Sequence, residues 1–392
     1  MIPIISSPVQ KSDISAALEL LKNRGVKSRF NESLEALFKS ESVKLANSGI
    51  AAFYILLEAI KKDSARNEVV LPAYTAGSLV VAVKKAGLRP VLCDISLDDF
   101  NADVSSMLNT ISKNTLAVVC VHIFGIGMSG IIGLKENIPG ETLLIEDCAQ
   151  AMGSCVKDIP VGGFSGASFF SFNRGKNLPL CGGGAIATNN HGLGREIKDQ
   201  DKQITLTGKA GNNQGALLKT RVFRLLSDPF IYGLAFPFGR LFKETKPAKD
   251  FAVTEINDFE AALGVTLLRK ADEFFNARHK NGLFLANALK DAQGIMIPSI
   301  TQGSRTAFNR FPLVFKEMPA LERAEKELAR IGIESSRMYL KPLHKMFELG
   351  YQNYDFPNAS YLADRLLTLP THTNLKVIDL ERMAESIRKS IQ

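Results

Sequence analysis

Short apolar segments that alternate with helix-like segments dominate residues 43–190, and this pattern restricts the fold more than any other feature of the sequence. Three of the apolar segments are TLAVVCVHIFG (115–125), ETLLIEDCAQ (141–150) and ASFFSF (167–172). Their apolar positions are continuous, which is typical of strands that are buried on both faces of a sheet. NSGIAAFYILLEAIKK (47–62) has the length and spacing of a helix that covers such a sheet. The pattern predicts an α/β fold with a large, doubly wound, mostly parallel sheet.

The length of the chain, 392 residues, favours two domains. We expect a large domain over residues 1–250 and a smaller α+β domain over residues 251–392. Within the smaller domain, the hydrophobic pattern predicts one long amphipathic helix over 253–290 and strands over 306–315 and 331–339.

An apolar and basic insertion at about residues 205–250 interrupts the alternating pattern, and its apolar part covers residues 217–242. Pro229 and Pro237 divide this part and charged residues interrupt it, so we expect no membrane-spanning helix there. Two interpretations remain open. The segment either packs against a second subunit and forms a wall of the substrate cleft, or makes a weak contact with an anionic membrane surface.

Composition and charge exclude several other classes of protein. The first residues, MIPIISSPVQ, lack the pattern of a signal peptide. The five cysteines include no C-x-x-C pair, which favours free thiols in a cytoplasmic protein. The five histidines have no metal-ligand spacing, so we expect no metal site. The net charge of +8 suits small anionic substrates, and we expect no nucleic-acid partner.

Polar residues follow four of the predicted strands at the point where each strand ends. These residues are Asp94, His122, Asp147 and Ser171. Ligands of open α/β sheets bind beyond the carboxyl ends of the strands. Position alone therefore makes these four residues candidates for a binding site.

One lysine, Lys176, lies in a glycine-rich turn between two predicted strands, in SFFSFNRGKNLPLCGGG. A lysine amine forms a Schiff base with an aldehyde, and a turn leaves the side chain free to move. An aldehyde cofactor with a pyridine ring and a phosphate would need a carboxylate at its ring nitrogen, for which Asp147 is the candidate. Its phosphate would need a helix N-terminus, and Ser48 and Gly49 open the helix that continues at Ile50.

Each of these candidates also has a simpler explanation. Asp147 can cap a helix or form an ion pair, and Ser48 with Gly49 can be an ordinary helix N-cap. A lone lysine such as Lys176 is commonly solvated. His122 can face the cofactor ring or its hydroxyl, or it can be a core histidine with satisfied hydrogen bonds.

The sequence resembles the DegT/StrS-type sugar aminotransferases, which are pyridoxal-phosphate enzymes of the aspartate aminotransferase fold, fold type I. The motifs that carry the resemblance run in order over nearly the whole chain: NSGIAAFYILLEAI, EVVLPAYTAGSLVVAVKKAGLRPVLCDI, VHIFG, IEDCAQAMGS, FSGASFFSFNRGKNLPLCGGGAIATN, FNRFPLVF, MYLKPLH and LLTLP. The resemblance implies a homodimer that transfers an amino group from glutamate to a keto group of a nucleotide-linked sugar, in polysaccharide or secondary-metabolite biosynthesis.

The resemblance also assigns roles to residues of this chain. Lys176 matches the lysine that binds pyridoxal phosphate, and Asp147 matches the partner of its ring nitrogen. Gln150 matches a residue near the ring hydroxyl, and Ser171 matches a phosphate ligand. A related branch of dehydratases has histidine at the lysine position, so Lys176 argues against that branch.

The sequence departs from the family pattern at several positions. Gly49 and Ile50 match the phosphate-binding helix turn, but the family usually has threonine where this chain has Ile50. The aromatic residue that stacks on the cofactor usually falls at Ala76, and Tyr74 is the candidate replacement. Val253 stands where the family often has an asparagine that reaches the phosphate in the other subunit. Two alternatives therefore stay open: a pyridoxal-phosphate enzyme for an amino acid or a non-sugar ketone, and a non-catalytic regulatory homologue.

Overall fold

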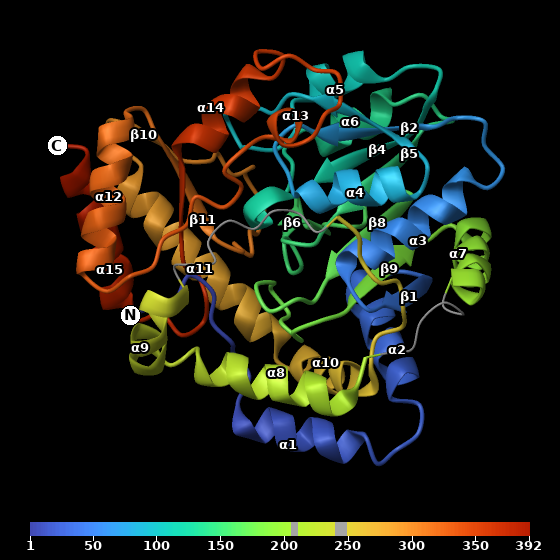
Figure 1. Ribbon diagram of the computed structural model, residues 1–392, viewed down its shortest axis with the longest axis horizontal. Helices are drawn as coiled ribbons and strands as arrows, with labels where there is room; N and C mark the ends of the chain where they lie inside the picture. The colour runs from blue at the N-terminus through green and yellow to red at the C-terminus, as the bar shows by residue number, and fades with distance from the viewer. Residues whose placement is uncertain (205–210, 240–248) are drawn as a thin grey trace.

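A seven-stranded sheet forms the centre of the computed structural model, which describes residues 1–204, 211–239 and 249–392 (Figure 1). The strands, in their order across the sheet, are β1 (Ser42–Ala46), β9 (Gly184–Thr188), β8 (Ala167–Ser171), β5 (Leu143–Asp147), β4 (Thr115–Val121), β2 (Glu68–Pro72) and β3 (Arg89–Cys93). Only β9 runs against the others, because it pairs antiparallel with both β1 and β8. The predicted α/β fold with a mostly parallel sheet is confirmed.

Helices cover both faces of this sheet, which explains why its strands are apolar throughout. On β8, the ring of Phe169 stacks on Phe53 of α3 (Gly49–Lys61) at 4.8 Å. The next residue, Phe170, points to the opposite face and stacks on Phe38 of α2 (Val26–Phe38) at 3.8 Å. The helices α4 (Gly77–Lys85) and α7 (His191–Ile204) pack on the face of α3, whereas α5 (Val104–Thr110) and α6 (Ile131–Asn137) pack on the other.

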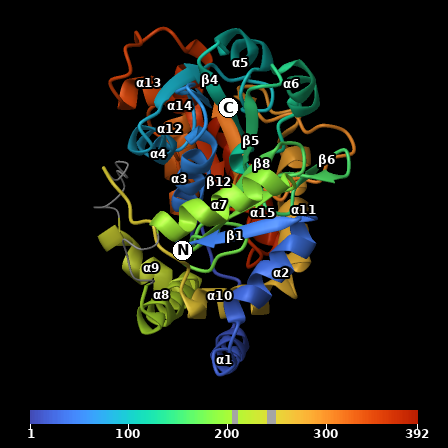
Figure 2. The ribbon, with the colours of Figure 1, turned by 90° about the vertical axis from the view of Figure 1, so that its right-hand side faces the viewer.

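A small antiparallel sheet lies to the left of the central one in Figure 1 and behind it in Figure 2. It contains β10 (Ile295–Met296), β11 (Phe311–Phe315) and β12 (Leu366–Leu369). The helices around it are α11 (Ala271–Leu289), α12 (Met318–Arg330), α14 (Pro357–Arg365) and α15 (Val377–Ser390). The division into two domains at residue 250 remains a prediction.

Two predictions for the C-terminal part are wrong. The helix expected over 253–290 is two helices, α10 (Asp258–Leu268) and α11, because Lys270 has a non-helical backbone and pairs with Asp13 at 2.6 Å. The strand expected over 331–339 makes only isolated bridges, since its backbone has a positive φ at Met338.

The described part of the insertion forms two helices along one edge of the molecule, α8 (Asn213–Leu225) and α9 (Pro229–Gly239) (Figure 1). Residues 205–210 and 240–248 of the insertion lie outside the described residues. Within the described ranges, no helix combines the length and the apolar character that crossing a bilayer requires. The remaining elements are α1 (Lys11–Leu20), η1 (Ile123–Gly125), β6 (Cys155–Val156), β7 (Ile159–Pro160) and α13 (Leu343–Met346).

Candidate active site

Lys176 lies in the connection between β8 and β9, at the carboxyl end of the parallel strands. The turn is closed by a hydrogen bond from the backbone N–H of Lys176 to the carbonyl of Asn173, at 2.9 Å. The side chain is partly exposed, yet burial lowers the pKa of Lys176 to about 8; the charge of Asp147 opposes this shift and that of Arg310 adds to it. An amine with such a pKa has a far larger unprotonated fraction near neutral pH than an ordinary lysine, and this fraction can attack a carbonyl carbon.

Asp147 is the last residue of β5, and its side chain is buried. One carboxylate oxygen accepts a hydrogen bond from the backbone N–H of Ala149 at 2.9 Å. Burial raises the pKa of Asp147, and the Ala149 N–H and the charge of Lys176 offset part of this effect. The structure therefore brings Asp147 and Lys176 into one electrostatic environment, as the positional argument predicts, while Asp147 also stabilises a turn.

A cradle for an anion lies at the N-terminus of α3. Ser48 is the N-cap, and its hydroxyl accepts a hydrogen bond from the N–H of Ala51 at 3.2 Å. Gly49 faces Ser171 at the end of β8 so closely that a Cβ on Gly49 would lie 2.6 Å from the Ser171 Cβ. Free backbone amides, the serine hydroxyls and the helix dipole fit a phosphate group. Ile50 is the second residue of the helix and contributes a backbone amide but no hydroxyl.

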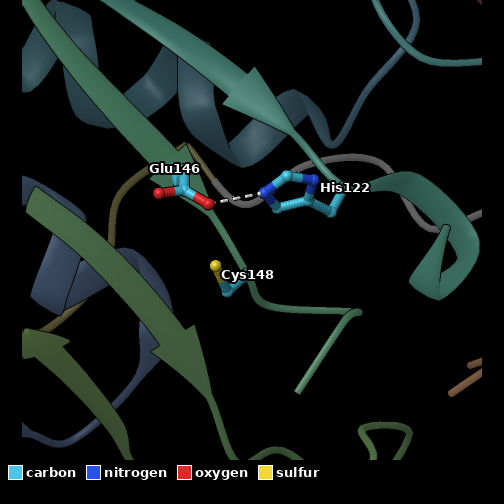
Figure 3. Close-up of side chains that lie close together, drawn as sticks. All are labelled: His122, Glu146 and Cys148. Carbon is cyan, nitrogen blue, oxygen red and sulfur yellow. Dashed lines mark hydrogen bonds and ion pairs between the residues drawn. The ribbon is translucent and has the colours of Figure 1, made fainter. Parts of the chain in front are cut away.

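Both ring nitrogens of His122 have protein partners. His122 is fully buried, and its Nδ1 accepts a hydrogen bond from the N–H of Met128 at 3.1 Å. Its Nε2 lies 3.0 Å from Glu146 Oε2 (Figure 3). The ring is therefore a neutral imidazole that donates to Glu146, which matches the simpler interpretation of a satisfied core histidine. Only the face of the ring remains for a ligand.

Figure 3 also shows Cys148 near the same pair, and possible ligand atoms of the three side chains lie within 4.8 Å of one another. Glu146 is already saturated, since it also accepts hydrogen bonds from the N–H groups of Gly162, Phe164 and Ser165 at 2.6–2.9 Å. Burial raises the pKa of the Glu146 carboxyl, but the hydrogen bonds from His122 and the backbone outweigh burial and hold it below its usual value. The cluster is therefore a hydrogen-bond network around the buried carboxylate of Glu146, with a structural role.

Gln150 and Tyr74 meet at a residue that the sequence did not single out, Tyr339. The amide of Gln150 accepts from the N–H of Phe124 at 3.1 Å and donates to the hydroxyl of Tyr339 at 3.3 Å. The rings of Tyr74 and Tyr339 pack edge to face with centroids 5.7 Å apart. Tyr74 therefore packs on an aromatic side chain, while Ala76 lies at the N-cap of α4 and offers only a methyl group.

Arg310 is the second residue that the sequence reasoning missed. Its neighbour Asn309 donates a hydrogen bond to the carbonyl of Gly175 at 2.7 Å, which holds the start of β11 against the Lys176 turn. The sequence carried a signal for both missed residues, since Arg310 lies in FNRFPLVF and Tyr339 in MYLKPLH, two of the motifs that carry the resemblance. Asp94, by contrast, accepts from the N–H groups of Asn358 and Ala359 and caps α14 away from the lysine.

A cavity of about 590 Å³ adjoins the cradle. Ser48 and Gly183 form its wall on the side of the cradle, and α8 and α10 contribute Lys219 and Glu260. Val253 is buried and contributes no polar group. Burial raises the pKa of Glu260 to about 7, although hydrogen bonds from Asn257 offset part of the effect.

Comparison with known proteins decides the family. The DegT/DnrJ/EryC1/StrS aminotransferase family matches residues 21–388. The chain belongs to this family. It is 27% identical over 353 residues to a UDP-N-acetyl-3-dehydro-alpha-D-glucosamine 3-aminotransferase of Acidithiobacillus ferrooxidans, and the alignment covers 88% of this chain and 83% of the relative. The predicted family and its aminotransferase activity are confirmed.

Solved structures share the fold. Helicobacter pylori PseC, an aminotransferase of pseudaminic acid biosynthesis, matches with a TM-score of 0.80 and 20% identity over 99% of this chain and 98% of PseC. A GDP-4-keto-6-deoxy-D-mannose-3-dehydratase of Escherichia coli with bound pyridoxal phosphate matches with a TM-score of 0.77 and 18% identity over 100% of this chain and 99% of the dehydratase. The fold alone is therefore common to aminotransferases and dehydratases, and the side chains of the site must distinguish them.

Proposed function

We propose that this aminotransferase uses pyridoxal phosphate to transfer an amino group from glutamate to a keto group of a nucleotide-linked sugar. One observation carries the proposal: an amine whose pKa is about 8, Lys176, lies beside the buried carboxylate of Asp147 at the carboxyl end of the sheet. The close approach of Gly49 to Ser171 supports phosphate binding independently of the lysine, because a Cβ at Gly49 would close the cradle.

The residues of the site divide the binding of the cofactor among them. We assign the cofactor aldehyde to Lys176, the ring nitrogen to Asp147 and the ring hydroxyl to Gln150. The phosphate fits the hydroxyls of Ser48 and Ser171, and the residues at positions 49 and 50 add their backbone amides. Ala76, Tyr74 and the ring face of His122 remain candidates for contacts with the ring.

Lys176 and Asp147 also have roles in proton transfer. Pyridoxal phosphate, when bound, supplies an electron sink for the electron pair that a departing proton leaves on the substrate carbon. The amine of Lys176 would accept that proton at Nζ and release it again, because its pKa of about 8 suits both steps at mildly alkaline pH. Asp147 holds a proton on the ring nitrogen, and its buried position keeps water from replacing it.

The nucleotide-linked substrate is supported by the relatives, one of which is named as acting on a UDP-linked keto sugar. A screen of amino donors against nucleotide-linked keto sugars tests the assignment on the purified protein. We expect glutamate and one keto sugar to yield 2-oxoglutarate and an amino sugar in equal amounts. If glutamate reacts but every keto sugar is inert while a non-sugar ketone is aminated, the enzyme belongs to the alternative class. If the bound cofactor exchanges no amine with any donor, the regulatory alternative holds.

We also propose that the enzyme is a homodimer, as the family resemblance implies, and that the insertion has a free outer face. The outer faces of α8 and α9 carry an apolar ridge, which we define as Leu218, Val222, Leu225, Phe230 and Leu234. These side chains are 45–75% exposed, and Lys219, Arg221 and Arg224 lie among them. Apolar and basic side chains together fit a weak contact with an anionic membrane surface. Light scattering on the purified protein measures the oligomeric state.

A further inference from the structure

A second group of polar side chains meets beside Lys176, and the roles described so far do not use their polar atoms. Its members are Arg310, at the start of β11, and Tyr74, which follows β2. The Nε atom of Arg310 and the hydroxyl of Tyr74 are both buried without a hydrogen-bond partner among the described residues. Burial raises the pKa of Tyr74, and the backbone of Tyr339 offsets part of this effect from outside hydrogen-bond geometry.

Buried donors without an acceptor are destabilising and therefore rare in native proteins. Arg310 is the more unusual of the two, because its unpartnered Nε belongs to a charged group. Burial lowers the pKa of Arg310, and the nearby Tyr339 and Glu334 oppose this effect. Glu334 does not neutralise the guanidinium by direct contact, since its Oε2 accepts from the N–H of Ile4 at 2.8 Å and from the hydroxyl of Tyr232 at 2.7 Å.

The position of Arg310 relative to the reacting groups is fixed by its neighbours. Asn309 donates to the carbonyl of Gly175 at 2.7 Å and to the side chain of Asn177 at 3.2 Å, so that both residues flanking Lys176 are tied to the segment of Arg310. Tyr74 is 1% exposed and packs on Tyr339. The unpartnered Nε of Arg310 therefore belongs to a segment that is tied to both neighbours of Lys176.

We propose that Arg310 and Tyr74 bind the carboxylate that the amino donor carries on its reacting carbon. This assignment rests on the proposed function. A guanidinium offers paired N–H groups that match the two oxygens of a carboxylate, and the Tyr74 hydroxyl adds a third donor. An amino acid carries its carboxylate on the same carbon as its amino group, so this anion must lie next to Lys176. The diphosphate of a nucleotide-linked sugar is separated from the keto carbon by part of the sugar ring, so it fits this position less well.

The test compares wild-type holoenzyme with Arg310→Gln, Arg310→Lys and Tyr74→Phe. The first readout is the binding of 2-methylglutamate, measured by calorimetry, because this compound has the carboxylate but no α-hydrogen and cannot complete the transfer. We expect Arg310→Gln to weaken binding about 100-fold, which is typical for the loss of one partner of a buried charge pair. Arg310→Lys should recover part of the affinity, and Tyr74→Phe should weaken binding less than Arg310→Gln does.

The second readout separates the donor from the sugar. Wild-type enzyme should prefer glutamate over 4-aminobutyrate, which has no carboxylate on the reacting carbon, and Arg310→Gln should lose this preference. Arg305→Gln is the matched control: Arg305 lies five positions earlier, its Nε donates to the carbonyl of Gly153 at 3.1 Å, and its removal should leave the preference intact. Thermal melts of each variant show whether it is folded, and Arg310→Lys serves if Arg310→Gln is not.

The possible failures are distinguishable. If wild-type enzyme transfers amino groups from glutamate but Arg310→Gln binds 2-methylglutamate as tightly as wild type, the carboxylate site is wrong and the proposed function stands. If Arg310→Gln impairs only the reaction with the keto sugar, the group binds the sugar and the inference is overturned. If the wild-type holoenzyme reacts with no amino donor at all, the proposed function itself fails.

Discussion

Gly49 and Ser171 approach each other closely in the candidate phosphate cradle: a Cβ on Gly49 would lie 2.6 Å from the Cβ and 3.1 Å from the hydroxyl of Ser171. The two residues are far apart in the sequence. Ser171 is the last residue of β8 in the central sheet, and Gly49 is the first residue of α3. Any side chain at Gly49 must therefore displace Ser171 or tilt the first turn of α3.

We predict that Gly49→Ala weakens the binding of pyridoxal phosphate at least tenfold, which corresponds to about 1.4 kcal/mol of binding free energy. Titration of the apoenzyme with pyridoxal phosphate, followed by protein fluorescence, measures the change. Gly133→Ala in α6 is the control, because nothing lies within 4 Å of the added Cβ there. Equal affinity of Gly49→Ala and wild type would show that the phosphate binds elsewhere.

Substitution of Lys176 should abolish turnover. Lys176→Ala lacks the amine, and Lys176→Arg carries a guanidinium that stays protonated and cannot form the covalent bond to the aldehyde. Non-covalent binding of the cofactor should persist in Lys176→Ala, since the cradle and Asp147 are unchanged. Borohydride reduction followed by peptide mass spectrometry should attach the cofactor to the Lys176 peptide of wild type only. A wild-type rate in either variant contradicts the assignment.

Asp147→Asn should lower kcat by several orders of magnitude, because an amide keeps the shape of the side chain but not the charge that holds the ring nitrogen protonated. Each tenfold loss corresponds to about 1.4 kcal/mol of transition-state free energy. Asp94→Asn is the matched control, since Asp94 also follows a strand but caps α14. It should leave kcat near the wild-type value, because an asparagine caps a helix about as well as an aspartate. Near-normal kcat in Asp147→Asn would leave Asp147 as a turn-stabilising residue.

Glu260 makes stability depend on pH. Burial raises the pKa of its carboxyl from 4.5 to about 7, so the folded state keeps a proton that the unfolded state releases between these pH values. The free energy of unfolding attributable to Glu260 therefore falls as pH rises through this window, by up to about 3 kcal/mol. Glu260→Gln should remove this part of the pH dependence, which urea unfolding at pH 5 and at pH 7.5 measures.

Glu255 on the same cavity provides the control of opposite sign. The hydrogen bond from Lys27 lowers the pKa of Glu255, so its contribution to stability is lost as pH falls below the ordinary value of a glutamate. Glu255→Gln should therefore reduce stability at pH 7.5 more than at low pH. A Glu260→Gln variant with an unchanged pH profile would show that Glu260 titrates normally.

The apolar ridge predicts salt-sensitive co-flotation with liposomes that contain anionic lipids. Replacing Leu218, Val222 and Phe230 by serine should abolish it, because these side chains are 63%, 45% and 75% exposed. Serine at Val377 and Ile378, which are exposed at the start of α15, is the control and should change nothing. If wild type stays in the liposome-free fraction at low salt, the membrane contact is wrong. If the triple variant instead dissociates the dimer, the ridge belongs to the subunit interface.

The expected long helix shows where hydrophobic pattern alone misleads. The apolar spacing over 253–290 is compatible with one helix, but an interruption of two residues leaves the same pattern in the sequence. The ion pair between Lys270 and Asp13 of α1 holds the break, and the Asn257 cap, which accepts from the N–H of Glu260 at 2.8 Å, sets where α10 begins. Local periodicity carries no information about such a distant partner.

The sequence by itself determined the parallel, doubly covered sheet and the positions of Lys176 and Asp147, because two-sided burial leaves continuous apolar strands whose polar ends must share one edge. Only the tertiary structure decided what surrounds them. It turned the ring nitrogens of His122 toward Glu146 and Met128, and it brought Arg310 to Lys176 through the hydrogen bond of Asn309 with Gly175, 134 residues away. The physical reason is that strand and helix patterns follow from local burial, whereas a contact between remote segments depends on how whole layers pack.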